Sequence, residues 1–366
     1  MRVKLGDVCE RGSSNLKQSD VVEMKGDYPV YGASGCIGNA DFYHQENSYV
    51  AIVKDGAGIG RTTLHPAKSS VIGTMQYLLP KNNVLPEYLY YVVSYMHLEK
   101  YFTGATIPHI YFKDYKNEEF NLDSVDMQKQ VVEVLGRCEA VIEGRKRELQ
   151  LLDDLIKARF VEMFGNPVIN EKRWRQKSLG EITTKIGSGA TPKGGKGAYQ
   201  EEGITLIRSM NVHNGLFEYR ELAHISDEQA AKLDNVAIEE NDVLLNITGA
   251  SVARSCVVPN KILPARVNQH VCIIRCKEYI NPVFLNKLLI DDNYQDLLWS
   301  VAGAGATREA ITKQQVESLQ IIMPPVELQN EFMRFCNQVD KSKVAVQKAL
   351  DETQLLFDSL MQQYFG

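Results

Sequence analysis

The chain has 366 residues, of which 44% are hydrophobic and 24% charged, so its length favours two or three domains with sizeable cores. Its net charge of −5 and pI of about 5.9 argue against a bare, nonspecific nucleic-acid binder, which is usually basic. The opening residues MRVKLGDVCE predict no signal peptide, and no apolar run reaches the roughly 18 residues that span a bilayer. These features favour a cytoplasmic protein with no membrane partner.

Cysteine and histidine spacing predicts neither a disulfide framework nor a metal site. None of the seven cysteines belongs to a CxxC pair, and the seven histidines show no metal-ligand spacing. The closest cysteines, Cys272 and Cys276, lie in VCIIRC, which is typical of a buried strand. We therefore expect reduced thiols and no bound metal.

Residues 1–123 have the mixed pattern of an α+β domain. SYVAIVK and QYLLP are strand-like, and a helix is predicted to begin near Pro86. GAGIGRT at 56–62 resembles a phosphate-binding glycine loop, but its spacing is GxGxG and Pro66 stands where a helix should follow. The better interpretation is a turn between strands that presents Arg61.

A long helix with a heptad stripe is predicted at 124–166, with Ser124 as N-cap, and a second at 324–366 after Pro324 and Pro325. Each would run about 38 residues, or about 57 Å. A narrow apolar stripe needs a partner, so we expect the two helices to pair antiparallel; the alternative is that each lies on its own domain core. The predicted pairing residues are Val131, Leu135, Ile142, Leu149, Leu152, Ile156, Phe332, Val339, Val346, Leu350, Phe357 and Leu360.

Residues 167–323 again predict an α+β domain. DVLLNIT and VCIIRC are strand-like, and Asn281 suits the N-cap of a helix that begins at Pro282. Between Lys172 and Lys196 there are seven basic residues and one acid, within a run that includes GSGATPKGGKGAY. Small, hydroxyl and basic residues together suit phosphate contacts; the alternative is a solvated linker loop. The candidate phosphate contacts are Lys185, Thr191, Lys193 and Lys196.

Two further motifs do not support catalysis. NPVF at 281–284 resembles the Asn-Pro-Pro-Phe motif of adenine methyltransferases, but the second proline and the glycine-rich cofactor loop are missing. GGKGAY at 194–199 is no Walker A motif, because no Ser or Thr follows Lys196 at the required place. We expect no catalytic residues in this chain.

The two halves of the sequence are related by an internal duplication. FG at 164–165 and at 365–366 are 201 residues apart, and the same offset relates Gln128 to Gln329. The offset shrinks upstream, to 196 near Pro86 and Pro282 and to 193 between GAGIGR and GASVAR. Such a stepwise drift is what loop insertions do to a repeat, and the second copy is the longer one.

The ordered segments of both copies resemble one known family, the specificity subunits of type I restriction–modification systems. The resemblance covers essentially the whole chain and rests on LGEITTKIGSGATPKGG, TGASVAR, VNQHVCIIRC, AGAGATREAIT and MPPVELQ, together with the duplication. It implies two target-recognition domains separated by two antiparallel helices, each domain reading half of a bipartite DNA target. The first copy departs from the pattern, with GSSN at 12–15 in place of the Thr-Pro loop.

The resemblance also implies partners and a division of labour. Two modification subunits would dock on the helices, bind S-adenosylmethionine and methylate adenine, so this chain would need no cofactor of its own. A restriction subunit with translocase and nuclease activity is a further partner that the family allows. Loops of each domain would enter the major groove, which carries the unambiguous base code. The candidate readers are Arg61, Gln76, Thr106, His109, Lys193, Arg208, Asn211, Arg254, Gln269 and Arg308.

Two other functions remain open on the sequence alone. The chain could be a DNA adenine methyltransferase in its own right, which would require a cofactor loop. It could instead be a coiled-coil adaptor that binds only proteins.

Overall fold

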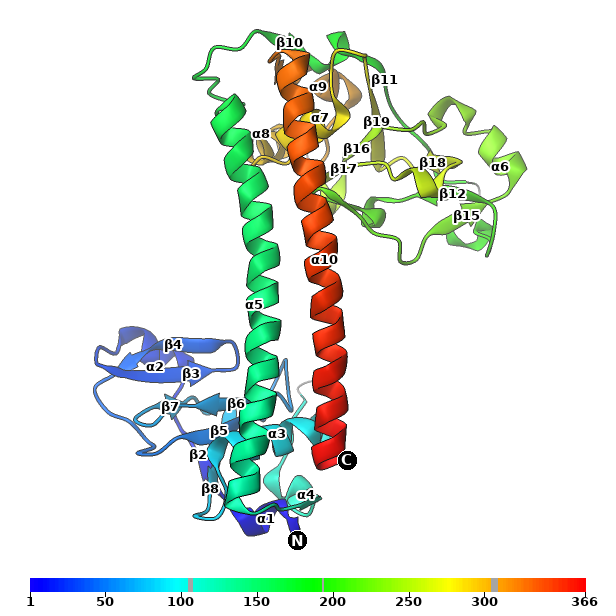
Figure 1. Cartoon of the computed structure of the whole chain (residues 1–366). Helices are drawn as coiled ribbons and strands as arrows, with labels where there is room; N and C mark the ends of the chain where they lie inside the picture. The colour runs from blue at the N-terminus through cyan, green and yellow to red at the C-terminus, as the bar shows by residue number, and fades with distance from the viewer. Residues whose placement is uncertain (105–107, 193, 304–308) are drawn as a thin grey trace. The chain divides into compact units, whose positions relative to one another are not determined.

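The computed structural model describes residues 1–104, 108–192, 194–303 and 309–366, which fold as two compact units. The first comprises Met1–Glu148 and Val346–Gly366, and the second comprises Leu149–Ala345. Two helices of 40 residues each, α5 (Val125–Phe164) and α10 (Val326–Phe365), contribute one segment to each unit (Figure 1). No helix within the described ranges combines the length and apolar character that crossing a membrane requires.

The first unit holds one four-stranded, one three-stranded and one two-stranded sheet. The four-stranded sheet is antiparallel with the order β2-β8-β5-β6, and the three-stranded sheet has the order β4-β3-β7. The strands are β1 (Arg2–Lys4), β2 (Cys9–Ser13), β3 (Tyr28–Gly32), β4 (Gly35–Ala40), β5 (Tyr49–Val53), β6 (Thr62–His65), β7 (Ser70–Val71), β8 (Met75–Pro80) and β9 (Glu119–Asn121). The helices besides α5 and α10 are α1 (Leu5–Val8), α2 (Gln18–Glu23), α3 (Pro86–Tyr95), the 3-10 turn η1 (Leu98–Tyr101) and α4 (Phe112–Tyr115).

The second unit repeats this arrangement with insertions. Its four-stranded sheet has the order β11-β19-β16-β17, and its three-stranded sheet has the order β15-β12-β18. The strands are β10 (Gln176–Ser178), β11 (Thr183–Ser188), β12 (Ile204–Ile207), β13 (Val212–His213), β14 (Leu216–Phe217), β15 (Ala223–Ile225), β16 (Val243–Asn246), β17 (Ser255–Val257), β18 (Ala265–Val267), β19 (Val271–Cys276) and β20 (Gln320–Ile322). The helices are α6 (Asp227–Ala231), α7 (Pro282–Leu289), α8 (Asp292–Gly303) and α9 (Lys313–Ser318). Among its described residues the second unit has six 3-10 turns, which include η2 (Leu179–Glu181), η4 (Ser209–Asn211) and η6 (Gly249–Ser251).

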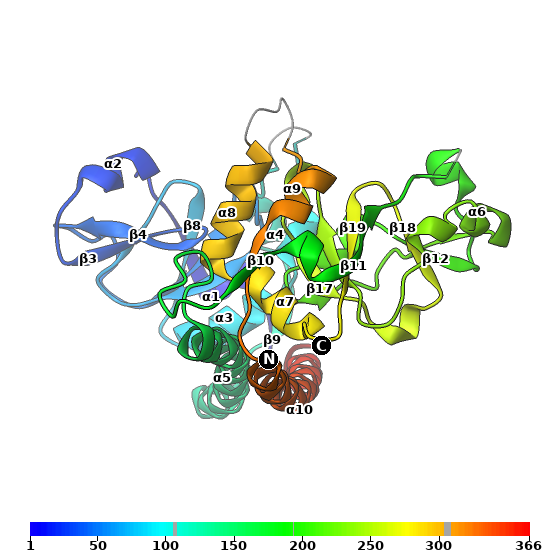
Figure 2. The ribbon, with the colours of Figure 1, turned by 90° about the horizontal axis from the view of Figure 1, so that it is seen from above.

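The interior strands β5 and β16 of the two four-stranded sheets are buried on both faces of the sheet. This burial explains why their sequences are continuously apolar. In β16, Val243 and Leu245 pack toward α7, α8 and α9, whereas Leu244 packs toward the three-stranded sheet. Figure 2 shows α6, β12 and β18 on the side of β19 and β11 that is remote from α7 and α8. In β5, Val50 and Ile52 alternate in the same way with Tyr49, Ala51 and Val53.

The predicted strands and helix starts are confirmed. SYVAIVK, DVLLNIT and VCIIRC contain β5, β16 and β19, QYLLP covers all of β8 except Met75, and α3 and α7 begin at their prolines. The side-chain oxygen of Asn281 accepts the N–H of Val283 at 2.9 Å, as an N-cap should. The segment 54–61 is the turn between antiparallel β5 and β6, as the sequence predicted, and not a nucleotide loop.

The duplication is confirmed by sheet order and by hydrogen bonds that recur at the sequence offsets. In both copies the middle strand of the three-stranded sheet has one antiparallel and one parallel neighbour. The N–H of Val53 donates to the carbonyl of Arg61 at 2.9 Å, and the N–H of Asn246 donates to that of Arg254 at 2.8 Å. The two copies are therefore one fold built twice, with the β13–β14 hairpin among the additions to the second.

The apolar stripes of the long helices face inward. None of the 12 predicted pairing residues is exposed, while Leu151, Leu155 and Leu355 beside the stripes are. In the second unit Arg159 of α5 contacts Glu331 of α10 at 3.1 Å, and Lys343 contacts Asp153, so the segments run antiparallel there. The sequence posed helix pairing and packing on a domain core as alternatives. In the second unit the α5 and α10 segments contact each other and also pack on the domain core, because Phe332 and Val339 belong to the same core as the α7 residues Phe284 and Leu288.

One buried glutamine ties each long helix to its unit. The side chains of Gln128 and Gln329 are both 0% exposed. Gln329 accepts the N–H of Asn281 at 2.9 Å and donates to the carbonyls of Tyr279 and Pro324. Gln128 makes the three equivalent bonds, to Leu85, Asn83 and Asp123. A single side chain thus fixes the start of the long helix against the start of α3 or α7.

Replacing Gln329 with Leu should destabilise the protein by about 3 kcal/mol, because a buried N–H and two carbonyls lose their partner. Urea unfolding would measure the difference. Gln338→Leu, at an exposed position of the same helix, is the control and should change stability by less than about 0.5 kcal/mol. Equal effects of the two substitutions would contradict the anchoring role.

The first unit also buries a histidine among aromatic rings. His65 is 5% exposed and stacks on Tyr49 at 5.2 Å between ring centroids. Its Nε2 lies 2.7 Å from the hydroxyl of Thr63. Burial lowers the pKa of His65 from 6.5 to about 4, so the imidazole stays neutral in the folded protein at neutral pH.

Stability should therefore fall as pH decreases from 6.5 toward 4, because the unfolded chain then binds a proton that folded His65 excludes. The loss from this group alone is about 2.5 kcal/mol between pH 7 and pH 4.5. Urea unfolding of the wild type and of His65→Phe at both pH values isolates it, since all other groups are shared. The variant should lose less stability on acidification, and parallel losses would refute this account.

Candidate nucleic-acid interface

Each copy has an arginine at the end of the turn that follows β5 in the first copy or β16 in the second. Gly56 and Gly249 occupy the same place in these turns, with φ of 84° and 75°, which favours glycine. The exposed Arg61 donates from Nη1 to the carbonyl of Ala33 at 2.9 Å. Arg254 is half-buried, with Nη1 at 3.4 Å from Nδ1 of His213. The turns thus hold both guanidinium groups in defined positions.

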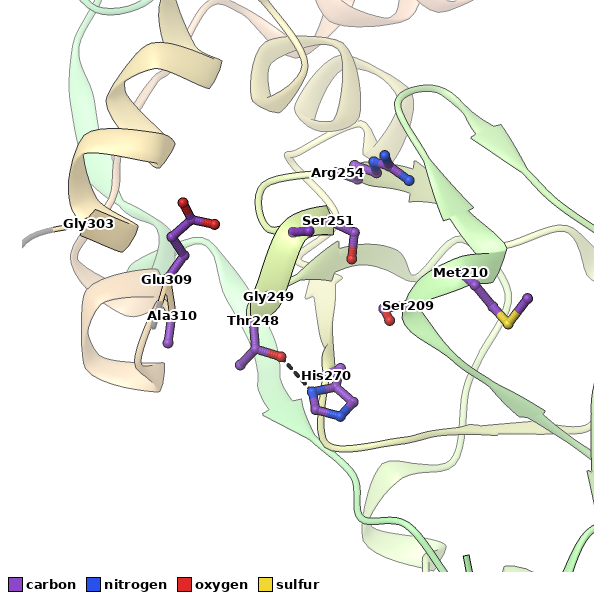
Figure 3. Close-up of a pocket in the computed structure, with 11 residues that line it drawn as sticks. Ser209, Met210, Thr248, Gly249, Ser251, Arg254, His270, Gly303, Glu309 and Ala310 are labelled. Carbon is purple, nitrogen blue, oxygen red and sulfur yellow. Dashed lines mark hydrogen bonds between the residues drawn. The ribbon is translucent and has the colours of Figure 1, made fainter. Parts of the chain in front are cut away.

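A concave surface of the second copy gathers side chains from segments far apart in the sequence (Figure 3). It draws on η4, on η6 and the turn before β17, on the loop before β19, and on the end of α8. Its lining residues are Ser209, Met210, Thr248, Gly249, Ala250, Ser251, Arg254, His270, Gly303, Glu309 and Ala310. With one arginine, one carboxylate, hydroxyls and an imidazole, this surface offers both donors and acceptors.

Four polar side chains form a chain of hydrogen bonds at this surface. The hydroxyl of Thr191 donates to Oε1 of Gln269 at 2.5 Å, and Nε2 of Gln269 lies 3.0 Å from Nε2 of His270. Since an amide nitrogen can only donate, the His270 hydrogen lies on Nδ1 and points to the hydroxyl of Thr248, 2.5 Å away. Figure 3 draws this last contact. The Thr248 hydroxyl hydrogen and the second Gln269 amide hydrogen remain as donors, the groups that guanine and phosphate oxygens accept.

In the first copy an imidazole from a different segment contacts the residue equivalent to Thr248. The offset of 193 relates Thr248 to Asp55, and Nδ1 of His109 lies 2.7 Å from the Asp55 carboxylate. The backbone is the same in both: Gly56 donates to Pro108, and Gly249 donates to Glu309, each at 3.0 Å. The same backbone arrangement therefore carries the carboxylate of Asp55 in the first copy and the hydroxyl of Thr248 in the second.

The remaining predicted contacts differ in accessibility. Lys185 is half-buried on β11, and Thr191 and Gln269 are exposed. Gln76 is buried and is already bonded to Tyr115 and Gly12, and Asn211 is fully buried with its amide on the carbonyls of Glu218 and Arg220. These two are the weakest candidates, because reaching DNA would break internal bonds. Arg208 is intermediate in accessibility between these two groups of residues. Its guanidinium donates to the Glu221 carbonyl and lies 5.5 Å from the centroid of the Tyr199 ring.

Some predictions fall outside the described residues. They are Thr106, Lys193 and Arg308, together with the side chain of Lys196.

Sequence reasoning missed Asp55, Thr248 and His270. The signal available was the duplication, because Asp55 and Thr248 stand directly before the paired glycines at the same offset. His270 follows the predicted Gln269, but its partner lies 22 residues away along the chain. That contact depends on the pairing of β16 with β19 and was not visible in any local motif.

Three buried thiols of the chain are not activated. Burial raises the pKa of Cys9, Cys256 and Cys272 to about 12 in each case, so they stay protonated at neutral pH. Within the described ranges, no three His, Cys, Asp or Glu side chains group as a metal site would require.

Known proteins resemble this chain in sequence. The family model described as type I restriction modification DNA specificity domain matches residues 1–152 and again residues 171–353. The type I restriction enzyme MjaIX specificity subunit of Methanocaldococcus jannaschii is 24% identical over 306 residues, covering 78% of this chain and 69% of that one. The putative MjaX specificity subunit of the same organism is 22% identical over 321 residues, covering 80% and 72%.

Two solved structures share the fold. The S subunit of a type I restriction–modification system from M. genitalium has a TM-score of 0.64 at 13% identity, with 100% of this chain and 96% of that one covered. A chain from work on complex assembly and conformational transition of the type I R-M system has a TM-score of 0.56 at 16% identity, with the same coverage. At these identities the likeness concerns the fold alone.

Proposed function

The chain belongs to the family of type I restriction modification DNA specificity domains, and we propose that it reads a bipartite DNA target with one recognition domain per half-site. The observation that carries this is the repeated arrangement of the two copies, which present different side chains at one equivalent position: Asp55, in contact with His109, in the first copy and Thr248, in contact with His270, in the second. Different donors and acceptors at one place suit two different half-site sequences.

The domains are assigned as residues 1–123 and 167–323, and the spacer helices as 124–166 and 324–366. The readers are the turns with Arg61 and Arg254, the Thr191–Gln269–His270–Thr248 chain and the Asp55–His109 pair. Lys185, Lys193 and Lys196 are assigned as phosphate contacts, and Thr106, Arg208 and Arg308 as further DNA contacts. Gln76 and Asn211 support it from below, since their side chains are buried.

The long helices act as a ruler and as the docking surface for other subunits. A helix of 40 residues is about 60 Å long, which is enough to space two readers that sit one DNA turn, about 34–36 Å, apart. Exposed leucines beside the stripe, such as Leu151 and Leu355, are available to a partner. The partners are two modification subunits, which bind S-adenosylmethionine and methylate adenine, and in some complexes a restriction subunit.

The chain itself is a non-catalytic specificity subunit that holds no cofactor, and it acts in the cytoplasm. The thiols of its four buried cysteines, Cys9, Cys256, Cys272 and Cys336, are protonated at neutral pH because burial raises their pKa, which fits a reader better than a nucleophilic enzyme. Calorimetry of the isolated chain with S-adenosylmethionine tests the alternative of a methyltransferase in its own right. Duplex binding with and without modification subunits tests the alternative of a protein-only adaptor.

Exchanging residues 167–323 for the corresponding domain of another family member should change one half of the recognised target and leave the other half intact. The reason is that each frame carries its own readers on its own loops. Methylome sequencing of cells that carry the hybrid, compared with cells that carry the parent chain, reports both halves. A change in both halves would contradict the modular assignment.

Inserting one heptad into α5 and one into α10 should lengthen the unread spacer of the target or abolish methylation. Each added heptad extends a helix by about 10.5 Å, close to three base pairs. An insertion of seven Gly and Ser residues in the 166–174 segment is the control and should leave the spacer unchanged. Methylation of the original target by the heptad variant would refute the ruler.

A further inference from the structure

The first copy contains a hollow lined by three cations from separate elements. Arg11 comes from β2, Lys54 follows β5, and Lys113 belongs to α4. We call this surface, together with its other lining residues, the basic hollow. The other lining residues are Ser13, Asp55, Gln76, Ile110, Tyr111 and Phe112.

Of these three cations, only Lys54 has an acidic partner among the described residues, the carboxylate of Asp55. Lys54 lies 3.9 Å from the Asp55 carboxylate, but that carboxylate is in closer contact with His109, at 2.7 Å. Arg11 and Lys113 form no ion pair with any residue that the structure describes. The Lys113 ammonium lies 5.4 Å from the ring of Tyr111, whose side chain is half exposed. Like charges around one hollow repel, so an anion that occupied it would be held strongly.

The second copy shows that the fold does not require these cations. The register of β2 on β8 and of β11 on β19 places Ile186 where the first copy has Arg11. The offset of 193 relates Lys54 to Ile247, and the offset of 201 relates Lys113 to Gln314. Both isoleucines are buried in the core that includes α8 residues. In the first copy only the four-residue turn η1 stands in place of the 12-residue α8, and the hollow is open.

We propose that the basic hollow binds a backbone phosphate of the duplex at the half-site that the first domain reads. This inference rests on the proposed function. Arg11 supplies a fork of donors, and Lys54 and Lys113 supply ammonium groups, which together suit the unesterified oxygens of a phosphodiester. Asp55 and His109 border the hollow, so a phosphate held there fixes the register of the reader beside it. In a chain of net charge −5, this is a local concentration of positive charge.

The test uses the full chain in complex with its modification subunits and the triple variant Arg11→Gln, Lys54→Gln and Lys113→Gln. The matched control is Lys4→Gln, Lys116→Gln and Lys129→Gln, which removes the same charge from residues of the first unit that do not line the hollow. Fluorescence anisotropy would measure the affinity for a target duplex and an unrelated duplex from 50 to about 200 mM salt. Circular dichroism and thermal unfolding would verify that both variants fold.

We expect the hollow variant to bind both duplexes about tenfold more weakly than the control, with their ratio unchanged. The slope of log affinity against log salt should be lower in magnitude by about 1, the value for one lost phosphate contact. A slope and affinity equal to those of the control would overturn the inference. So would calorimetric binding of inorganic phosphate or a nucleoside triphosphate that the hollow substitutions abolish while the duplex slope stays unchanged. If the wild-type complex binds the target duplex no more tightly than the unrelated duplex, the proposed function fails. The basic hollow is still tested in that case, because the salt dependence of binding to the unrelated duplex can be compared between the hollow variant and the control.

Discussion

The contact on which the second unit depends is a cluster of four phenylalanine rings, from α5, α7 and α10. Phe164 lies 4.8 Å from Phe284 and 5.4 Å from Phe332, and Phe160 lies 5.6 Å from Phe332, between ring centroids. Each such pair contributes about 0.5–1.5 kcal/mol beyond the burial of its area. The first unit repeats the key pair as Phe365 on Tyr88, at 5.5 Å. A long helix that ends in such a cluster cannot slide along its partner without emptying an apolar core.

This constraint explains what the sequence could predict. The stripe of Val131, Leu135 and Ile142 was visible because helical periodicity is local, and its members are buried. The duplication was visible because the core positions and glycines that define the frame keep their chemistry, as with Gln128 and Gln329. Sheet order was not visible, because β2 pairs with β8 across more than 60 residues and no local pattern specifies that partner.

The candidate site was predictable only in part, for the same reason. Arg61 and Arg254 could be found because a turn between strands has a sequence signature and both copies share it. The His270–Thr248 contact and the basic hollow could not, since each joins segments that only the folded sheet brings together. Burial was also invisible: glutamine and asparagine are plausible readers in any loop, yet Gln76 and Asn211 are structural. Helix pairing and packing on a domain core were treated as alternatives. The apolar stripe in the sequence does not show that one part of a helix can contact the other long helix while another part contacts a domain core.

The divergence of the two copies follows from where the frame tolerates change. The strands β5 and β16 have an apolar core on each face of their sheet. Their positions accept only apolar residues of similar volume, so both strands remain apolar. The second residue after each of these strands is Asp55 in the first copy and Thr248 in the second, and the two differ in charge without disturbing the backbone bonds of Gly56 and Gly249. Arg11 and Ile186 show the limit of this tolerance: a cation can replace a core isoleucine only where the covering helix is missing, as α8 is in the first copy. Insertions such as α8 thus decide which positions of a copy are buried and which are open to contact DNA. Two halves with the same fold need not contact DNA through the same positions.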